Sequence, residues 1–298
     1  MSGMPLTPEM VEAHLESERE SFAVRRIPTG VSDFDTIVKG GLPAGSLVLL
    51  LGDVGAGQRE YVYTSAAKIA IVSEYPHLKK YYLGSYCEDG ILPEKICYVS
   101  FTRSREAILK EVASSFNPQY VEAMKKMTVF KDFSGEYFKR TVVPPSWTNQ
   151  EDDGVFPKRS GSLLEKLINF LDENAQDSVV IIDSITDLVE SEEIENKDLI
   201  ATVKGLQRAS KQWDGIVYLL LTQGIMEERY QQMLMDSVDG VLKFIWKNYL
   251  RSSKRQRYMY VEKFMSVLPH LDKEQIARFP TMVTSNHGLT IVYMERII

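Results

Sequence analysis

The chain has 298 residues, of which 44% are hydrophobic and 26% charged, and its formal net charge is −6. This is an ordinary globular mixture, long enough for one large α/β domain or two small ones. The acidic balance argues against bulk electrostatic binding of nucleic acid. No apolar run reaches the roughly 18–20 residues that span a bilayer, and the glutamate-rich N-terminus is unlike a signal peptide. We therefore expect a cytoplasmic protein without a membrane partner.

Residues 1–24 are predicted to form a helical extension outside the main domain. Thr7 is a candidate N-cap, Pro8 suits the first helical position, and glutamates follow in the first turns. A narrow apolar stripe is formed by Val11, Leu15 and Phe22. We interpret the segment as a helix lying on the main domain, with a partner-binding helix as the alternative.

From residue 25 onward, apolar strands alternate with helices. Strands are predicted at Ser46–Leu51, Ile96–Phe101, Met127–Phe130, Val179–Ile182 and Gly215–Thr222. Helices are predicted at Val31–Val38, Arg59–Ser73, Ser104–Ser115, Ser162–Asn174 and Lys197–Gln212. Strands this continuously apolar indicate a mainly parallel sheet that is covered on both faces.

Beyond residue 237 the pattern changes to one strand after another. These strands are predicted at Gly240–Trp246, Arg257–Phe264, Met282–Thr284 and Leu289–Met294. They are expected to extend the sheet in antiparallel fashion. The stretch 134–161, with three prolines and an acidic run, is predicted to be a long loop.

A glycine-rich loop follows the first predicted strand and precedes a helix, which is the context of a phosphate-binding loop. Its sequence is Gly52-Asp53-Val54-Gly55-Ala56-Gly57-Gln58-Arg59. The pattern G-x-x-x-x-G-K-[ST] places backbone N–H groups and a helix N-terminus around a phosphate. Here Gln58 stands at the lysine position and Arg59 at the position of the magnesium-binding hydroxyl. A purely structural turn remains the alternative.

Asp183 ends the strand predicted at 179–182, where open α/β sheets bind ligands. A carboxylate there is suited to hold a magnesium ion and its waters beside the loop. We expect this strand to be adjacent and parallel to Leu47–Leu51 in the centre of the sheet.

Together these features resemble the KaiC-like branch of the RecA superfamily, which is common in archaea and cyanobacteria. The matching segments are Arg26–Val31, Asp35, Gly40–Ser46, the glycine-rich loop, Tyr98–Phe101, Ile182–Ser184, Asp239–Val241 and Gly288–Ile291. The resemblance covers residues 25–298 and implies one RecA-like P-loop domain with a mainly parallel sheet and antiparallel C-terminal strands. It also implies ATP or ADP with Mg²⁺ as ligands, assembly into a ring or dimer, and a cis peptide bond between Asp183 and Ser184.

The chain departs from this family at several catalytic positions. The family's loop lysine contacts phosphates and the next hydroxyl binds magnesium, whereas Gln58 has no charge and Arg59 cannot ligate a cation. Where the family places a catalytic glutamate, this chain has Thr102-Arg103-Ser104-Arg105, and Glu106 comes a few residues late. Two family positions are retained, Asp183 and the γ-phosphate sensor Gln223. Lys263 matches the lysine that reaches a neighbour's nucleotide, but the arginine two residues later is replaced by methionine.

These losses favour a non-hydrolysing regulatory or scaffold subunit that binds other protein chains, including copies of itself. The first alternative is an unconventional ATP-binding protein or weak ATPase in which an arginine replaces the loop lysine. The second is a recombinase-like nucleic-acid-binding protein, motivated by the basic segment 251–257 and its aromatic neighbours Trp246, Tyr249 and Tyr258. A solvated hairpin, or a subunit interface, explains the same residues.

Overall fold

The computed structural model describes residues 25–88, 90–139, 141–148, 161–248, 255–271 and 278–292. The expected N-terminal extension at residues 1–24 lies outside the described residues. The same holds for much of the predicted loop 134–161, for residues 251–254 of the basic segment, and for the end of the last predicted strand.

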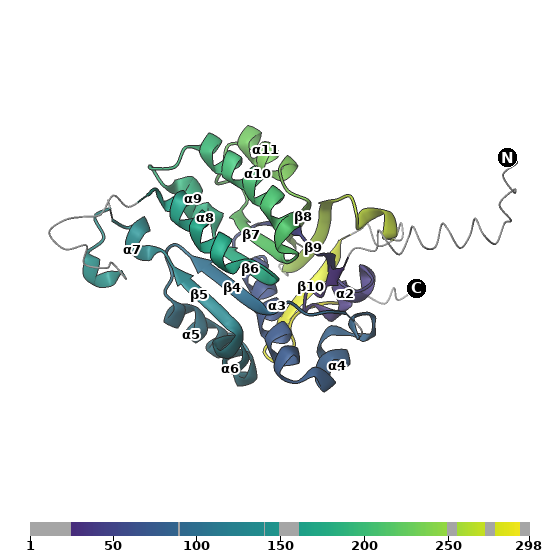
Figure 1. Cartoon of the computed structure of the whole chain (residues 1–298). Coiled ribbons are helices and arrows are strands. Elements are labelled where there is room, and N and C mark those ends of the chain that lie inside the picture. Colours follow the sequence, from purple (N-terminus) through teal and green to yellow (C-terminus); the bar gives the residue numbers. More distant parts are fainter. Residues whose placement is uncertain are drawn as a thin grey trace, which may run out of the picture.

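Within the described residues, a nine-stranded sheet crosses the molecule in the order β11-β10-β9-β8-β3-β7-β6-β4-β5 (Figure 1). Its strands are β3 (Ser46–Gly52), β4 (Lys95–Ser100), β5 (Thr128–Asp132), β6 (Ser178–Asp183), β7 (Ile216–Thr222), β8 (Gly240–Asn248), β9 (Arg255–Phe264), β10 (Phe279–Thr284) and β11 (Gly288–Ile291). Strands β3 to β8 pair in parallel, whereas β9, β10 and β11 extend the sheet in antiparallel fashion. The predicted fold class is confirmed.

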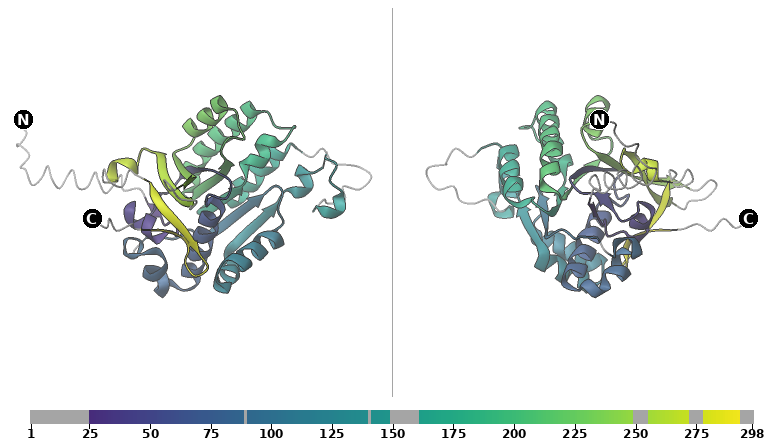
Figure 2. Two further views of the ribbon diagram at one scale, coloured as in Figure 1. Left: turned by 180° about the vertical axis from the view of Figure 1, so that it is seen from behind. Right: turned by 45° about the vertical axis from the view of Figure 1, so that its right-hand side comes forward.

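Helices cover both faces of this sheet (Figures 1 and 2). On one side lie α2 (Ser32–Ile37), α3 (Gln58–Glu74), α4 (Lys79–Leu83), α5 (Arg105–Ser115) and α6 (Pro118–Met127). On the other side lie α8 (Leu163–Asn174), α9 (Ile185–Glu190), α10 (Asn196–Trp213) and α11 (Glu228–Asp236), while the short α7 (Ser134–Tyr137) follows β5. Buried side chains of the two sides form separate hydrophobic clusters, so the alternate residues of each strand serve different cores.

Local sequence signals set where several helices begin. Ser104 caps α5 by accepting a hydrogen bond from the Ala107 backbone N–H. Ser162 and Glu165 form a reciprocal capping box at the start of α8. Both helices therefore begin where the sequence predicts.

One expectation about the sheet is wrong. Strands β3 and β6 are parallel and central, but they are not adjacent, because β7 lies between them. Leu219 of β7 is in register with Leu49 on one side and with Ile182 on the other. The apolar patterns of three buried parallel strands are alike, so the sequence indicates that they are central without fixing their order.

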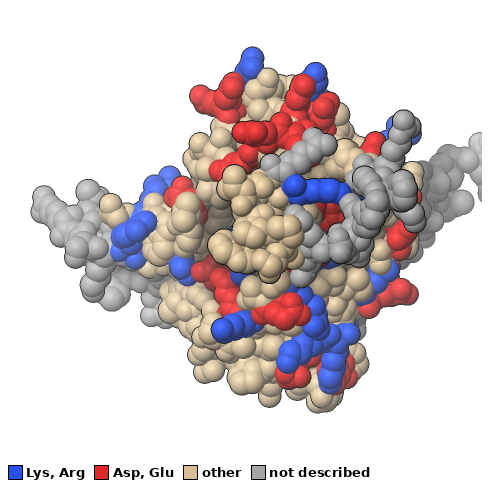
Figure 3. All heavy atoms as spheres, turned by 90° about the vertical axis from the view of Figure 1, so that its left-hand side faces the viewer, with Lys and Arg blue, Asp and Glu red and all other residues tan. Residues whose placement is uncertain are grey.

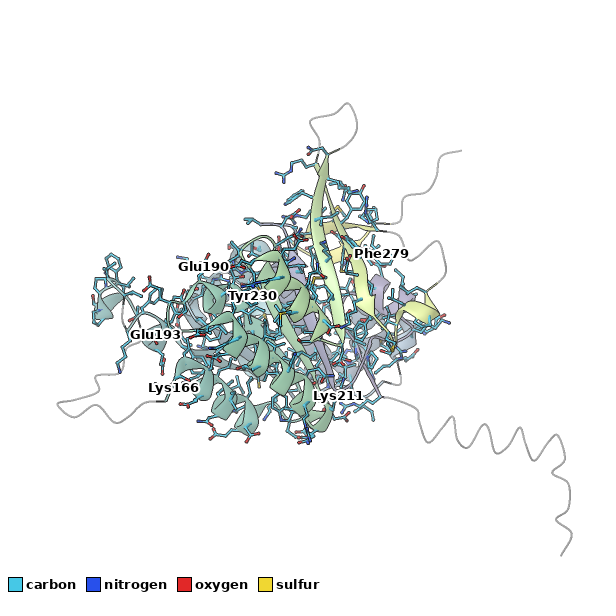
Figure 4. The ribbon with its side chains drawn as sticks, turned by 90° about the horizontal axis from the view of Figure 1, so that it is seen from above. Lys166, Glu190, Glu193, Lys211, Tyr230 and Phe279 are labelled. Atoms are coloured by element: carbon cyan, nitrogen blue, oxygen red, sulfur yellow. The ribbon has the colours of Figure 1, made fainter. Side chains whose placement is uncertain are left out.

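The antiparallel strands are fixed to the rest of the molecule by specific contacts. Phe279, labelled in Figure 4, lies on β10. It packs edge-on against Phe34 of α2, with ring centroids 6.2 Å apart. Lys211 of α10 pairs with Asp239 at 2.8 Å, just before β8, the parallel strand next to the antiparallel ones, begins. The short β1 (Arg26–Ile27) pairs with β2 (Leu42–Pro43) outside the main sheet. In the described part of the chain, no helix has the length and apolarity to cross a membrane.

Candidate functional site

A cavity of about 280 Å³ lies at the carboxyl ends of the parallel strands. It is bounded by the glycine-rich loop after β3, by the first turns of α3, by the end of β6 and by α5. The residues that line it are Asp53, Val54, Gly55, Gln58, Arg59, Glu60, Tyr63, Glu111, Ser115, Phe116, Asp183, Ser184, Thr186, Leu220, Leu221 and Thr222. The structure therefore brings most of the predicted nucleotide-binding residues to one cavity.

The glycine-rich loop is held by strand β8. Asp53 accepts a hydrogen bond from the Trp246 backbone N–H at 3.0 Å, and the Trp246 indole donates to the Val54 carbonyl at 3.2 Å. Gly57, the last loop residue before α3, has a φ of 125°, a conformation that side-chain-bearing residues rarely adopt. The loop thus has a defined shape that its own chain maintains.

Gln58, at the position of the family's lysine, packs back against the end of β3. A Cβ atom built on Gly52 would lie 2.3 Å from Gln58 Nε2, so only a glycine leaves room for this amide. The side chain is partly buried and lines the cavity. It offers an uncharged amide where the family has an ammonium group.

Asp183 is fully buried and accepts hydrogen bonds from three side chains. Arg59 donates from Nε to Oδ1 at 3.1 Å. On Oδ2, the Tyr98 hydroxyl donates at 2.7 Å and an Arg103 terminal nitrogen at 3.3 Å. Both oxygens of the carboxylate are therefore occupied by donors from α3, β4 and the loop after β4.

The same network continues away from Asp183. Arg103 also donates to the Tyr63 hydroxyl at 2.8 Å and pairs with Glu111 of α5, to which Tyr63 donates at 3.0 Å. Arg59 and Tyr63 lie four residues apart on α3 and share one face of that helix. Two guanidinium groups and two carboxylates are in this way brought to charge balance.

The titration of these groups follows their surroundings. Burial, and then the neighbouring Asp183 carboxylate, raise the pKa of Tyr98 well above its ordinary value, and the same two causes raise the pKa of Tyr63. Burial alone would lower the pKa of Arg59, but its pairing with Asp183 outweighs burial and the pKa is raised. At neutral pH the tyrosines are donors and the arginine is a cation.

The peptide bond between Asp183 and Ser184 is cis, as the resemblance implies. Asp187, one turn into α9, accepts hydrogen bonds from the backbone N–H and the hydroxyl of Ser184, both at 3.1 Å. Burial raises the pKa of Asp187. Its oxygen is used to fix the start of α9.

Three residues that stand at or near functional positions of the family lie outside the cavity or have other partners. The Gln223 side chain is exposed and is not part of the cavity lining, while its backbone N–H donates to the Gly52 carbonyl at 2.9 Å. Glu106 is 75% exposed and pairs with Arg105. Lys263 donates to the carbonyls of Met235, Asp236 and Val238 at 2.8–3.1 Å and so closes the end of α11.

The described part of the basic segment has partners within the chain. Arg255 and Arg257 both lie over the Trp246 ring, at 4.4 and 4.9 Å from its centroid. Arg257 also pairs with Glu60 of α3 at 3.2 Å. On the face shown in Figure 3, acidic side chains gather at the end formed by α9, α10 and α11. The contacts of Arg255 and Arg257 account for two of the segment's basic charges without a nucleic acid.

A magnesium ion does not fit beside Asp183 in this arrangement. The carboxylate already accepts three donors, and two of them are cations. Two unit charges about 4 Å apart interact by roughly 4 kcal/mol at an effective dielectric constant of 20, so a divalent ion beside two guanidinium groups is strongly disfavoured. Arg59, which stands at the position of the family's metal-binding hydroxyl, is also unsuitable, because an arginine has no acceptor for a metal.

The sequence did not predict four residues of this network as site residues: Tyr63, Tyr98, Arg103 as a partner of Asp183, and Glu111. The spacing of Arg59 and Tyr63 on a helix was a usable signal. Arg103 directly precedes the N-cap of α5 and Glu111 lies within that helix, so their pairing depends on the conformation of the loop that leads into α5.

No protein-family model matches the chain, and no curated protein matches it in sequence. Among solved structures, the chain is similar to the crystal structure of a KaiC-like protein from the hyperthermophilic archaeon Pyrococcus horikoshii OT3. The TM-score is 0.60 at 17% sequence identity, over 91% of this chain and 100% of the other. At this identity the match shows the fold, which is that of KaiC-like and RecA-like proteins.

Proposed function

We propose that this protein is a non-hydrolysing member of the KaiC/RecA-like proteins and acts as a regulatory or scaffold subunit through contacts with other chains. The observation that carries the proposal is the pairing of Asp183 with Arg59 and Arg103. In the family that the chain resembles, a hydroxyl that binds the metal stands at the position of Arg59, and the catalytic glutamate comes just after the strand that corresponds to β4. Both positions here carry a cation that binds the remaining carboxylate.

Hydrolysis requires several of these parts at once. Loss of a single stabilising group such as an arginine finger already costs about 10³–10⁵ in rate. Glu106, the carboxylate that lies nearest in sequence to the missing glutamate, is exposed, pairs with Arg105 and does not line the cavity. Glu111 does line the cavity, but it is paired with Arg103 and hydrogen-bonded by Tyr63. No described carboxylate of the cavity is thus free to orient a water.

The test is an ATP hydrolysis assay with Mg²⁺ on the wild type and on Asp183→Asn. We expect both to remain at background, far below the roughly 1 s⁻¹ that marks the low end of ordinary enzymes. A wild-type rate above background that Asp183→Asn abolishes contradicts the proposal. The first alternative, ATP or ADP held without turnover, is supported by the backbone N–H groups of the loop and would appear as binding in calorimetry.

Contacts between copies of the chain are the second part of the proposal. Lys263, the residue that the resemblance assigns to a neighbour's nucleotide, is engaged by three carbonyls of its own chain. We therefore expect assembly, where it occurs, to be independent of nucleotide. Sedimentation velocity with and without ATP measures this. An ATP-dependent oligomer that is lost in Lys263→Ala would instead indicate that Lys263 contacts the nucleotide of a neighbouring subunit.

A further inference from the structure

We infer that Arg59 and Arg103 are built-in cations of this site: they take the place of a divalent metal beside Asp183 and hold the loop, β4 and β6 together without a ligand. The inference rests on the proposed function, since it concerns the same cavity. It goes further because it states what the residues do instead of catalysis. It also predicts that no ligand of this site depends on Mg²⁺.

The first step is the geometry around Asp183. In metal-dependent sites of this fold, the ion links a carboxylate at a strand end to the loop helix. Here Arg59, the second residue of α3, makes that link directly at 3.1 Å, and Arg103 makes a second one from the loop after β4 at 3.3 Å. Ser100 of β4 is in register with Asp183 of β6, so the strand pairing itself brings Arg103 close.

The second step is the charge of the cavity as a whole. Four acidic residues line it, and each has a partner: Asp53 the Trp246 backbone, Glu60 Arg257, Glu111 Arg103, and Asp183 both Arg59 and Arg103. The four carboxylates and their three arginine partners together carry one net negative charge. A nucleotide phosphate therefore meets no excess of positive charge, and a metal ion meets no free carboxylate.

The third step is the exposure of the two arginines. Arg103 is 19% exposed and Asp183 is fully buried, so this pair is shielded from salt. The Arg59 side chain is 46% exposed and reaches the cavity. Substituting Arg59 removes the Arg59–Asp183 ion pair while leaving the Arg103–Asp183 pair in place.

A double-mutant cycle measures the interaction between Arg59 and Asp183. Arg59→Gln, Asp183→Asn and the double variant are compared with the wild type by urea denaturation. We expect coupling of about tenfold in the unfolding equilibrium constant, because residues in one salt-bridge network are energetically coupled. The matched control is Arg105 and Glu106, an exposed pair 3.6 Å apart, where we expect about threefold or less. Equal coupling in the two cycles overturns the inference.

A second measurement uses the wild-type protein and does not depend on a variant folding. ATP and ADP are titrated calorimetrically in EDTA and again in excess Mg²⁺. Equal binding in the two buffers, or none in either, supports the inference. Binding to the wild type that Mg²⁺ tightens tenfold or more overturns it. Such binding without turnover leaves the proposed function standing, whereas turnover that persists in EDTA defeats the proposed function alone.

Discussion

The glycines of this chain have separable roles that the structure makes visible. Gly41 lies in the Gly40-Gly41 turn, which is part of a segment that matches the sequence of the KaiC-like branch, and it has a φ of 102°. A Cβ atom built there would lie 2.1 Å from the Ile27 carbonyl oxygen. Gly205, in the middle of α10, is exposed and an added Cβ meets nothing within 4 Å. One glycine is therefore required by the backbone, and the other only weakens a helix.

This contrast gives a prediction with opposite signs. Gly41→Ala should destabilise the protein by more than about 2 kcal/mol, since the backbone must shift to accept the Cβ. Gly205→Ala should stabilise it by about 0.5–1 kcal/mol, because alanine is the better helix former. Urea denaturation of both variants measures the two effects. A neutral Gly41→Ala would mean that the turn between α2 and β2 can relax without cost.

Asp35 of α2 and Lys68 of α3 are buried charged residues that interact electrostatically. Asp35 accepts backbone hydrogen bonds from Thr29 at 2.8 Å and Gly30 at 3.1 Å. Burial raises the pKa of Asp35 to about 7, and burial lowers the pKa of Lys68 to about 8. In both cases the folded protein favours the neutral form.

The pH dependence of stability follows from these directions. Between about pH 4 and pH 7 folded Asp35 keeps a proton that the unfolded chain loses, so its contribution falls as pH rises, by at most about 1.4 kcal/mol per pH unit. We expect the stability difference between wild type and Asp35→Asn to shrink over this range in urea denaturation. A difference that stays constant from pH 4 to pH 7 contradicts the raised pKa. For Lys68 the sign is reversed: its contribution grows between about pH 8 and pH 10.5.

At the scale of elements, the sequence predicts the kinds of strand and helix well and their neighbours poorly. Continuous apolar runs identify β3, β6 and β7 as buried strands, because only strands covered on both faces can be apolar at every position. The order of these strands depends on tertiary packing, and β7 takes the place expected for β6. The candidate site shows the same limit. Its loop and Asp183 follow from motifs, whereas Glu111 and Tyr98 join it only through packing.

The central position of β7 is testable through its side chains. Leu219 is fully buried between the two neighbouring strands, while Leu164 on α8 is only partly buried against the same cluster. Leu219→Ala should cost about 3–5 kcal/mol, because the cavity cannot be filled by neighbours in a sheet centre. Leu164→Ala should cost clearly less. Similar losses in urea denaturation would argue against a central β7.

At the scale of the whole molecule, one sheet carries two cores. The cluster on the α3 side includes residues of the antiparallel strands, and the cluster on the α10 side includes Trp213. Since alternate residues of β3 and β7 belong to each cluster, neither core can open without disturbing the strands that the other needs. Residues 25–298 are therefore expected to form one cooperative domain, even though chains of this length do not always unfold in one step.

The tryptophans provide a probe in each core. Trp213 is buried against the α10 side, Trp246 packs partly buried against the α3 side, and Trp147 is 78% exposed. In a Trp147→Phe background, removing either of the other two leaves one reporter. We expect the fluorescence transitions of the two single-tryptophan proteins to coincide with each protein's loss of far-ultraviolet circular dichroism in urea, once the stability cost of each substitution is allowed for. If Trp246 reports an earlier transition than circular dichroism does while Trp213 follows it, the antiparallel strands unfold as a separate unit and the single-domain prediction is wrong.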